Sequence, residues 1–186
     1  YKKVLNNTAM LQRHNVNVNG GSKNARYFVS GTYTDQDGLM KTSGLKRYGL
    51  VSNTEYDVTP NTNLSVGINY ISETANNPAA YAETIFSRLA SLGSVAPAKF
   101  SNGYYAYSGF SGNPYSDVLA ESGYNRTTRN VFTGSFRLTQ QIPFIKGLSA
   151  SAAVTVDRNN AFQKGFTTPV PQYTLAQDRE EYTLQN

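Results

Sequence analysis

The sequence predicts an all-β fold: a segment of an antiparallel transmembrane β-barrel with long loops on one side. Two observations predict this class. Apolar and polar residues alternate with a period of two in six segments, as in strands that have one apolar and one polar face. The connections between the segments alternate between short and long, as the turns and loops of an outer-membrane barrel do.

The composition excludes several other classes. Only 39% of the 186 residues are hydrophobic, and no run approaches the ~18 apolar residues that a membrane-spanning helix needs. Fourteen Tyr and nine Phe argue against a disordered chain, which would be poor in aromatic residues. The seventeen Lys and Arg are scattered, so no basic arm indicates a nucleic-acid partner. The absence of cysteine excludes disulfides and thiolate metal sites.

The alternation is clearest where Leu64, Val66, Ile68 and Tyr70 face one way and the polar residues between them face the other. Six segments of this kind are expected to be strands, at 14–19, 25–34, 46–57, 63–70, 130–140 and 148–157. Most are roughly nine to eleven residues long, which is the length that a tilted strand needs to cross a bilayer. Tyr residues near the ends of the apolar faces are typical of the aromatic girdles of such barrels.

The connections are expected to alternate in length. Those at 20–24, 58–62 and 142–147 are short, whereas those at 35–45, at about 71–125 and after 157 are longer. Turns on the periplasmic side and loops on the extracellular side produce this alternation in an outer-membrane barrel.

The long connection has features of its own. Helical spacing of apolar residues over 78–92, with Pro78 near the start and Gly93 past the end, predicts a short helix. After this helix comes a Gly- and Tyr-rich patch. Its aromatic side chains are candidates for contact with a ligand or partner, since such rings stack on sugars and hold apolar groups: Tyr104, Tyr105, Tyr107 and Phe110. Alternatively, these rings fold the loop onto itself.

No constellation for catalysis or metal binding is found. The run Asp35–Gly38 resembles the start of a calcium loop, but Met40 and Lys46 stand where that loop needs Gly and Glu. His14 is the only histidine, so a zinc site or a His-based triad has no second histidine to use. The sequence predicts a protein that is not an enzyme, with no cofactor and no metal.

A soluble β-rich module, such as a carbohydrate-binding domain or an adhesin, is the alternative. The strands of a β-sandwich alternate in the same way, but their apolar residues are buried between two sheets. In a barrel the same residues face lipid, and the polar residues face a wet lumen.

An ordered series of motifs resembles a known family. It comprises Gly20-Gly21-Ser22, then Tyr27–Ser30 with Tyr33, then Asp35–Gly38 and Leu45–Tyr48, followed by Asn113-Pro114, Gly123–Asn125 and Ile142–Leu148. The series is similar to the barrel of SusC/RagA-type TonB-dependent transporters, over most of the chain from His14 to about 160.

This resemblance implies an outer-membrane nutrient importer of Gram-negative, Bacteroidota-like cells. Such an importer has a barrel of about 22 strands, an N-terminal plug with a TonB box, and a SusD-like surface lipoprotein as lid. TonB drives the uptake of glycans or peptides. Residues 1–186 contain no plug and about six strands, too few to enclose a plug-sized lumen. We therefore expect part of a longer polypeptide, with one sheet face against outer-membrane lipid and an extracellular loop at about 71–125.

Overall fold

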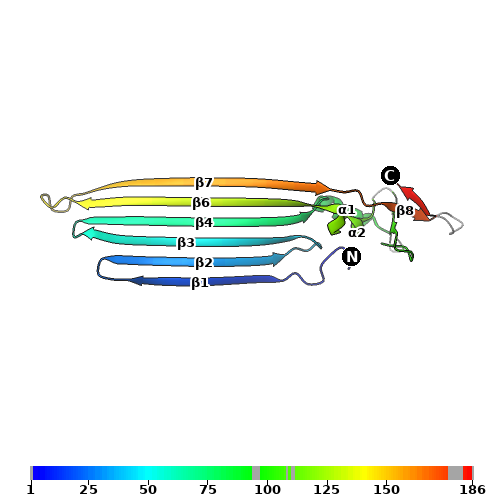
Figure 1. Cartoon of the computed structure of the whole chain (residues 1–186), viewed down its shortest axis with the longest axis horizontal. Coiled ribbons are helices and arrows are strands. Elements are labelled where there is room, and N and C mark those ends of the chain that lie inside the picture. The colour runs from blue at the N-terminus through cyan, green and yellow to red at the C-terminus, as the bar shows by residue number, and fades with distance from the viewer. Residues whose placement is uncertain (1, 94–96, 108, 110–111, 176–181, 186) are drawn as a thin grey trace.

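The computed structural model describes all residues except 1, 94–96, 108, 110–111, 176–181 and 186. Six long antiparallel strands form one open sheet (Figure 1), in the order β1-β2-β3-β4-β6-β7. They are β1 (Leu11–Gly21), β2 (Ala25–Asp37), β3 (Gly44–Thr59), β4 (Thr62–Pro78), β6 (Gly123–Gln141) and β7 (Ser149–Thr167). The six expected strands and their antiparallel order are therefore confirmed. Within the described residues, no helix is long and apolar enough to span a membrane.

The strands are longer than the sequence predicts. β4 continues to Pro78 and β6 begins at Gly123, so the connection between them covers 79–122 instead of 71–125. β7 likewise continues beyond Asp157 to Thr167. The additional residues are mostly polar, with isolated apolar residues such as Ile71 and Phe162, so their period-two signal is too weak to predict a strand. They still pair across the strands, as Thr74 does with Thr128. Backbone pairing, which needs no apolar residue, lengthens these strands.

All connections at one end of the sheet are turns. β1 and β2 are joined through 22–24, β3 and β4 through 60–61, and β6 and β7 through 142–148. The opposite end carries the connection over 38–43, the long connection over 79–122 and the chain after β7 (Figure 1). The expected division between the two ends is thus observed. The difference in length is smaller than expected, because 38–43 is shorter than the turn over 142–148.

The long connection contains its own small elements. They are the helix α1 (Ala82–Ser91), the strand β5 (Tyr105–Ala106), the helix α2 (Pro114–Asp117) and the 3-10 turn η2 (Ala120–Ser122). β5 pairs in parallel with β8 (Gln172–Leu175), and β8 pairs with β9 (Tyr182–Gln185) in a second, three-stranded sheet. The predicted helix is confirmed. The second sheet is not predicted, because its strands are too short to show an alternating pattern.

A glycine is required where η2 passes into β6. Gly123 has φ 108°, in the left-handed region. A Cβ atom at this position would lie 1.9 Å from the carbonyl oxygen of Phe166 on β7. Only glycine combines this φ with so close an approach of two backbones. The residue thus fixes where the long connection joins the sheet.

Candidate functional site

One face of the sheet is apolar over a continuous band near the turn end. Residues directly opposite each other on paired strands share a face, and the register places Leu64 beside Leu138 and Val66 beside Phe136. The members of this apolar band are Val16, Val18, Tyr27, Val29, Leu50, Tyr56, Leu64, Val66, Ile68, Tyr70, Phe132, Phe136, Leu138, Val154 and Val156. We call the face that carries this band the apolar face.

No second layer covers this band among the described residues. Val16 is 70% exposed and Val154 is 61% exposed, although both lie on the apolar face. The second sheet lies beyond the connection end of the long strands and not across them (Figure 1). A β-sandwich would bury these side chains between two sheets, whereas a barrel turns them toward lipid. The exposed band therefore favours the barrel segment over the soluble module.

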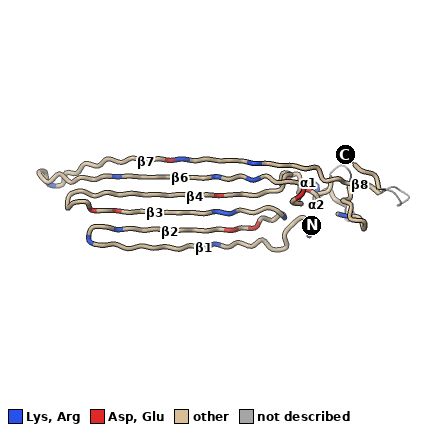
Figure 2. Tube along the Cα trace, viewed as in Figure 1, with Lys and Arg blue, Asp and Glu red and all other residues tan. Residues whose placement is uncertain are grey.

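The opposite, polar face is held together by hydrogen bonds and ion pairs between neighbouring strands. Arg26 on β2 pairs with Glu55 on β3 at 3.1 Å. Arg47 on β3 pairs with Glu73 on β4. Figure 2 shows charged residues distributed along the long strands and not gathered in one cluster. Such a face is compatible with the wet lumen of a large barrel.

The connection end of the sheet carries the hydrophobic core of the described residues. α1 turns Ile85 and Leu89, one helical turn apart, toward the same cluster. Val4 from the N-terminal segment, Met40 from the connection over 38–43 and Val118 after α2 complete the cluster. Three segments that are distant in sequence therefore form one ordered unit at the end of the strands, which we call the loop cap.

Buried polar groups order the loop cap further. The Asn113 side chain caps α2 by accepting a hydrogen bond from the backbone N–H of Tyr115 at 3.0 Å. Its Nδ2 atom donates to the carbonyl oxygens of Ala98 and Ala106, at 2.8 and 2.9 Å. Pro114 stands in the first turn of α2, where a missing N–H costs no helical hydrogen bond. One side chain thus joins three parts of the connection.

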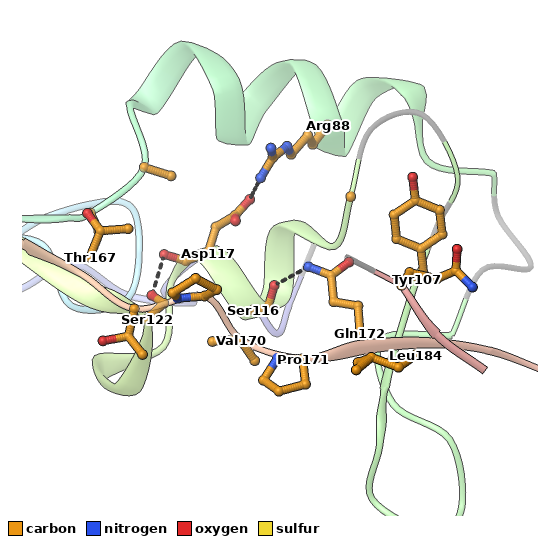
Figure 3. Close-up of a pocket in the computed structure, with 16 residues that line it drawn as sticks. Arg88, Tyr107, Ser116, Asp117, Ser122, Thr167, Val170, Pro171, Gln172 and Leu184 are labelled. Atoms are coloured by element: carbon orange, nitrogen blue, oxygen red, sulfur yellow. Dashed lines mark hydrogen bonds and ion pairs between the residues drawn. The ribbon is translucent and has the colours of Figure 1, made fainter. Parts of the chain in front are cut away.

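An ion pair connects the two helices of the loop cap. The Arg88 Nη1 atom lies 2.6 Å from the Asp117 Oδ2 atom. The side chains are 31% and 13% exposed, so the pair is more shielded from water than the pairs on the polar face. It holds α1 against α2 in the close-up of Figure 3.

The structure places the predicted aromatic patch inside this unit. Tyr104 stacks on Tyr173 of β8 with ring centroids 4.4 Å apart, yet it remains 44% exposed. The Tyr105 hydroxyl donates to Glu121, and the Lys99 Nζ atom lies 4.2 Å from the Tyr105 ring centroid. The backbone N–H of Tyr107 donates to the carbonyl oxygen of Tyr173 at 2.8 Å. Phe110 lies outside the described residues.

The surroundings of Tyr105 change the protonation of two groups. Burial, followed by the hydrogen bond to Glu121, raises the pKa of the Tyr105 hydroxyl above its ordinary value of 10.0. The hydrogen bond between Lys99 and Tyr105 raises the pKa of the Lys99 ammonium above 10.5. Both groups therefore stay protonated at neutral pH, and neither is poised for acid–base chemistry.

A cavity of about 620 Å³ lies between the loop cap and the segment that leads from β7 to β8 (Figure 3). Its walls include Arg88, Asp117, Tyr107 and Gln172. The volume lies within the ~300–1,000 Å³ of typical ligand sites. The Gln172 Nε2 atom donates to the Ser116 hydroxyl at 3.1 Å, which connects β8 to α2. The sequence gives no signal for this cavity, because its walls come from segments without periodicity.

The described residues contain no group of three His, Cys, Asp or Glu side chains that is arranged to hold a metal ion. His14 lies on β1, and its ring is stacked on Tyr33 with centroids 6.2 Å apart. Asp35 and Asp37 stand on β2, where Asp35 pairs with Lys46 at 3.5 Å. His14 and Asp35 thus contact side chains of the neighbouring strands.

The open antiparallel sheet has one face that suits contact with lipid, and an ordered cap lies at one end of its strands. This arrangement belongs to the class of outer-membrane barrels and is compatible with a wall segment of a TonB-dependent receptor. The chain is similar to TonB-dependent receptor P26 of Formosa agariphila, with 28% identity over 89% of this chain and 16% of that protein. It is 36% identical to TonB-dependent receptor P3 of the same organism, over 33% of this chain and 6% of that protein. No family model matches.

A third similarity concerns the receptor SusC itself. TonB-dependent receptor SusC of Bacteroides thetaiotaomicron is 49% identical over 22% of this chain and 4% of that protein. The relatives are named as receptors and not as enzymes. These findings confirm the resemblance to a SusC-like TonB-dependent receptor. The chain spans about a sixth of the length of the first of these relatives, at most.

Proposed function

We propose that this chain is part of the wall and of the extracellular surface of an outer-membrane importer that takes up glycans or peptides. One observation supports this most: a sheet with an exposed apolar band carries an ordered cap at a single end. The band fits lipid, the polar face fits a lumen, and the cap stands where ligand arrives. The similarity to receptors that include SusC supports the same function.

In this proposal the Tyr patch supplies the contacts with the ligand or the lid. Tyr104 is held by the ring of Tyr173, so it presents its exposed surface without a large ordering cost. Tyr107 lines the cavity beside Gln172. Tyr105 is engaged with Glu121 and Lys99, and it is better suited to support its neighbours. Phe110 remains a candidate on its sequence position alone.

The proposed partners follow from the same assignment. A SusD-like surface lipoprotein would close over the loop cap, and TonB would act through an N-terminal plug region. Lipid of the outer membrane would surround the apolar band. We propose no nucleic-acid partner and no cofactor.

The test uses the full-length receptor that contains this segment, produced in its outer membrane. The double variant Tyr104→Ala and Tyr107→Ala should weaken uptake or the recovery of the lid lipoprotein, while the barrel stays folded as judged by resistance to SDS without heating. Tyr81→Ala is the matched control, because Tyr81 is an exposed Tyr of the same connection outside the patch. Normal uptake and normal recovery of the lid in the double variant would remove the patch from the proposed site.

A further inference from the structure

The apolar face changes its chemistry beyond the apolar band, toward the connection end of β6 and β7. The register sets Arg126 opposite Lys164 and Tyr124 opposite Phe166. These four residues, which we call the cationic patch, lie on the same face as Phe136 and Val154, because each is an even number of residues from them along its strand. Figure 2 shows the basic positions toward this end of the two strands.

The patch is partly organised. The Arg126 Nε atom donates to the Asn76 Oδ1 atom of β4 at 2.7 Å. The Arg126 guanidinium lies 5.4 Å from the centroid of the Tyr124 ring. The Tyr124 and Phe166 rings lie 6.4 Å apart. Asn76 and Tyr124 thus orient the guanidinium, and Lys164 stays exposed beside it.

On the apolar face of β4, β6 and β7, the charged residues are all cations: Arg126, Arg158 and Lys164. Two cations directly opposite each other across strands repel and destabilise the pair unless an anion neutralises them. On the apolar face of β4, β6 and β7, every position of which is described, no Asp or Glu occurs. Glu73 and Asp157 belong to the polar face of the same strands. Arg126 and Lys164 form no ion pair with any described residue. The counter-charge must come from outside these strands.

The position of the cations along the strands indicates which group supplies the counter-charge. On β6 the last apolar residue of this face before the patch is Phe132, and Arg158 lies directly opposite it. On β7 the exposed Phe162 lies beyond Arg158, on the same face and two residues before Lys164. If the hydrocarbon ends at Phe162, then at ~3.3 Å per residue and a tilt of ~45° Lys164 and its partner Arg126 lie about 5 Å above its edge. The phosphates of a lipid headgroup lie within about 5–8 Å of that edge, so the two cations stand at the depth of these phosphates.

We propose that Arg126 and Lys164, with Arg158 below them, bind the phosphates of a saccharide-based glycolipid in the outer leaflet, on the lipid side of β6 and β7. The proposal rests on the outer-membrane placement proposed above. The guanidinium of Arg126 donates two parallel hydrogen bonds to a phosphate, and Lys164 adds a point charge. Tyr124 and Phe166 lie two residues beyond Arg126 and Lys164 on the same face, where their rings can pack against the saccharide of the headgroup.

The experiment uses the full-length receptor in nanodiscs of phosphatidylcholine, with and without lipid A. Lipid A should raise the midpoint of thermal unfolding of the wild type, and the rise should shrink with added salt. The double variant Arg126→Gln and Lys164→Gln should lose the rise. The matched control, Arg129→Gln and Arg137→Gln, removes two arginines from the polar face of the same strand and should keep it.

Two further arms identify the ligand. Dephosphorylated lipid A should give no rise, and inorganic phosphate added to the receptor in detergent should give none. A rise that persists in the Arg126 and Lys164 variant, or that needs no phosphate on the lipid, would overturn the proposal. An equal rise with inorganic phosphate would assign the patch to free anions instead. Fractionation of the receptor with the outer membrane and its uptake activity are read separately, so the proposed function stands or fails independently.

Discussion

At the scale of single residues, the two faces of the sheet tolerate different kinds of side chain. Val66 and Ser65 are neighbours on β4, but Val66 stands beside Phe136 in the apolar band, whereas Ser65 stands between Glu55 and Arg137 on the polar face. A charge introduced at the two positions therefore meets lipid in one case and polar groups in the other.

The first prediction follows from this difference. Val66→Arg should destabilise the assembled barrel by about 2–4 kcal/mol, because an Arg near the bilayer midplane loses its hydration. Ser65→Arg should cost much less, since the wet polar face hydrates the new cation and Glu55 on one side offsets the repulsion by Arg137 on the other. Unfolding by denaturant in lipid vesicles measures both. Equal losses for the two variants would mean that the face assignment of β4 is wrong.

The second prediction concerns the ion pair of the loop cap. Arg88→Leu should destabilise the cap by about 1–3 kcal/mol, because it leaves the shielded Asp117 carboxylate without its donor. Arg26→Leu is the control, since its pair with Glu55 is more than half exposed and should contribute about 0–1 kcal/mol. Hydrogen exchange of the α1 amides and of the β2 amides separates the two effects. Unchanged exchange of α1 in Arg88→Leu would show that the pair does not hold the helices together.

At the scale of elements, α1 depends on packing and not on its ends. Its N-terminal residue Tyr81 provides no side-chain hydrogen bond as a cap. Ile85, by contrast, is 0% exposed and packs against Val4, Met40 and Val118. A ten-residue helix is marginal by itself in water, so this cluster is what keeps it folded.

The third prediction tests that dependence. Ile85→Ala should cost about 2–5 kcal/mol of local stability, because it leaves a void in a closely packed cluster. Cleavage by protease within 79–122 should become faster, while the barrel keeps its resistance to SDS without heating. Phe86→Ala, at the neighbouring exposed position, should leave cleavage unchanged. Loss of the folded barrel in Ile85→Ala would instead mean that the cap and the strands fold as one unit.

Some helices and strands are predictable from the sequence and others are not. The strands are predictable where one face is apolar, as around Val66, because burial in lipid imposes a period of two. Their extensions are not, since residues such as Thr74 and Asn76 are polar on the same face as Val66. The helix is predictable from the spacing of Ile85 and Leu89. The cavity, the Arg88–Asp117 pair and the second sheet depend on contacts between distant segments, which no local pattern records.

At the scale of the whole molecule, the sheet separates two environments along its length. The three turns lie at one end, and the loop cap with both described ends of the chain lies at the other (Figure 1). An outer-membrane barrel places short turns in the periplasm and long loops outside the cell. Leu39 and Phe144 are exposed residues at these opposite ends.

The fourth prediction is therefore one of sidedness. In the full-length receptor on intact cells, Leu39→Cys should react with a membrane-impermeant thiol reagent, and Phe144→Cys should not. The chain has no native cysteine in these 186 residues, so labelling of the segment reports the introduced thiol. Both positions should react once the outer membrane is permeabilised. Labelling of Phe144→Cys on intact cells would reverse the orientation.

The length of the strands has a consequence for how cargo would pass. β6 and β7 each have 19 residues, although ~9–11 residues are enough to cross the hydrocarbon. In a closed barrel, the residues of the strands beyond this number would extend the barrel wall above the bilayer. Its inner surface is the polar face, and its rim is the loop cap. In the importer proposed above, a molecule that enters at the rim would be enclosed laterally by protein before it reaches the depth of the membrane.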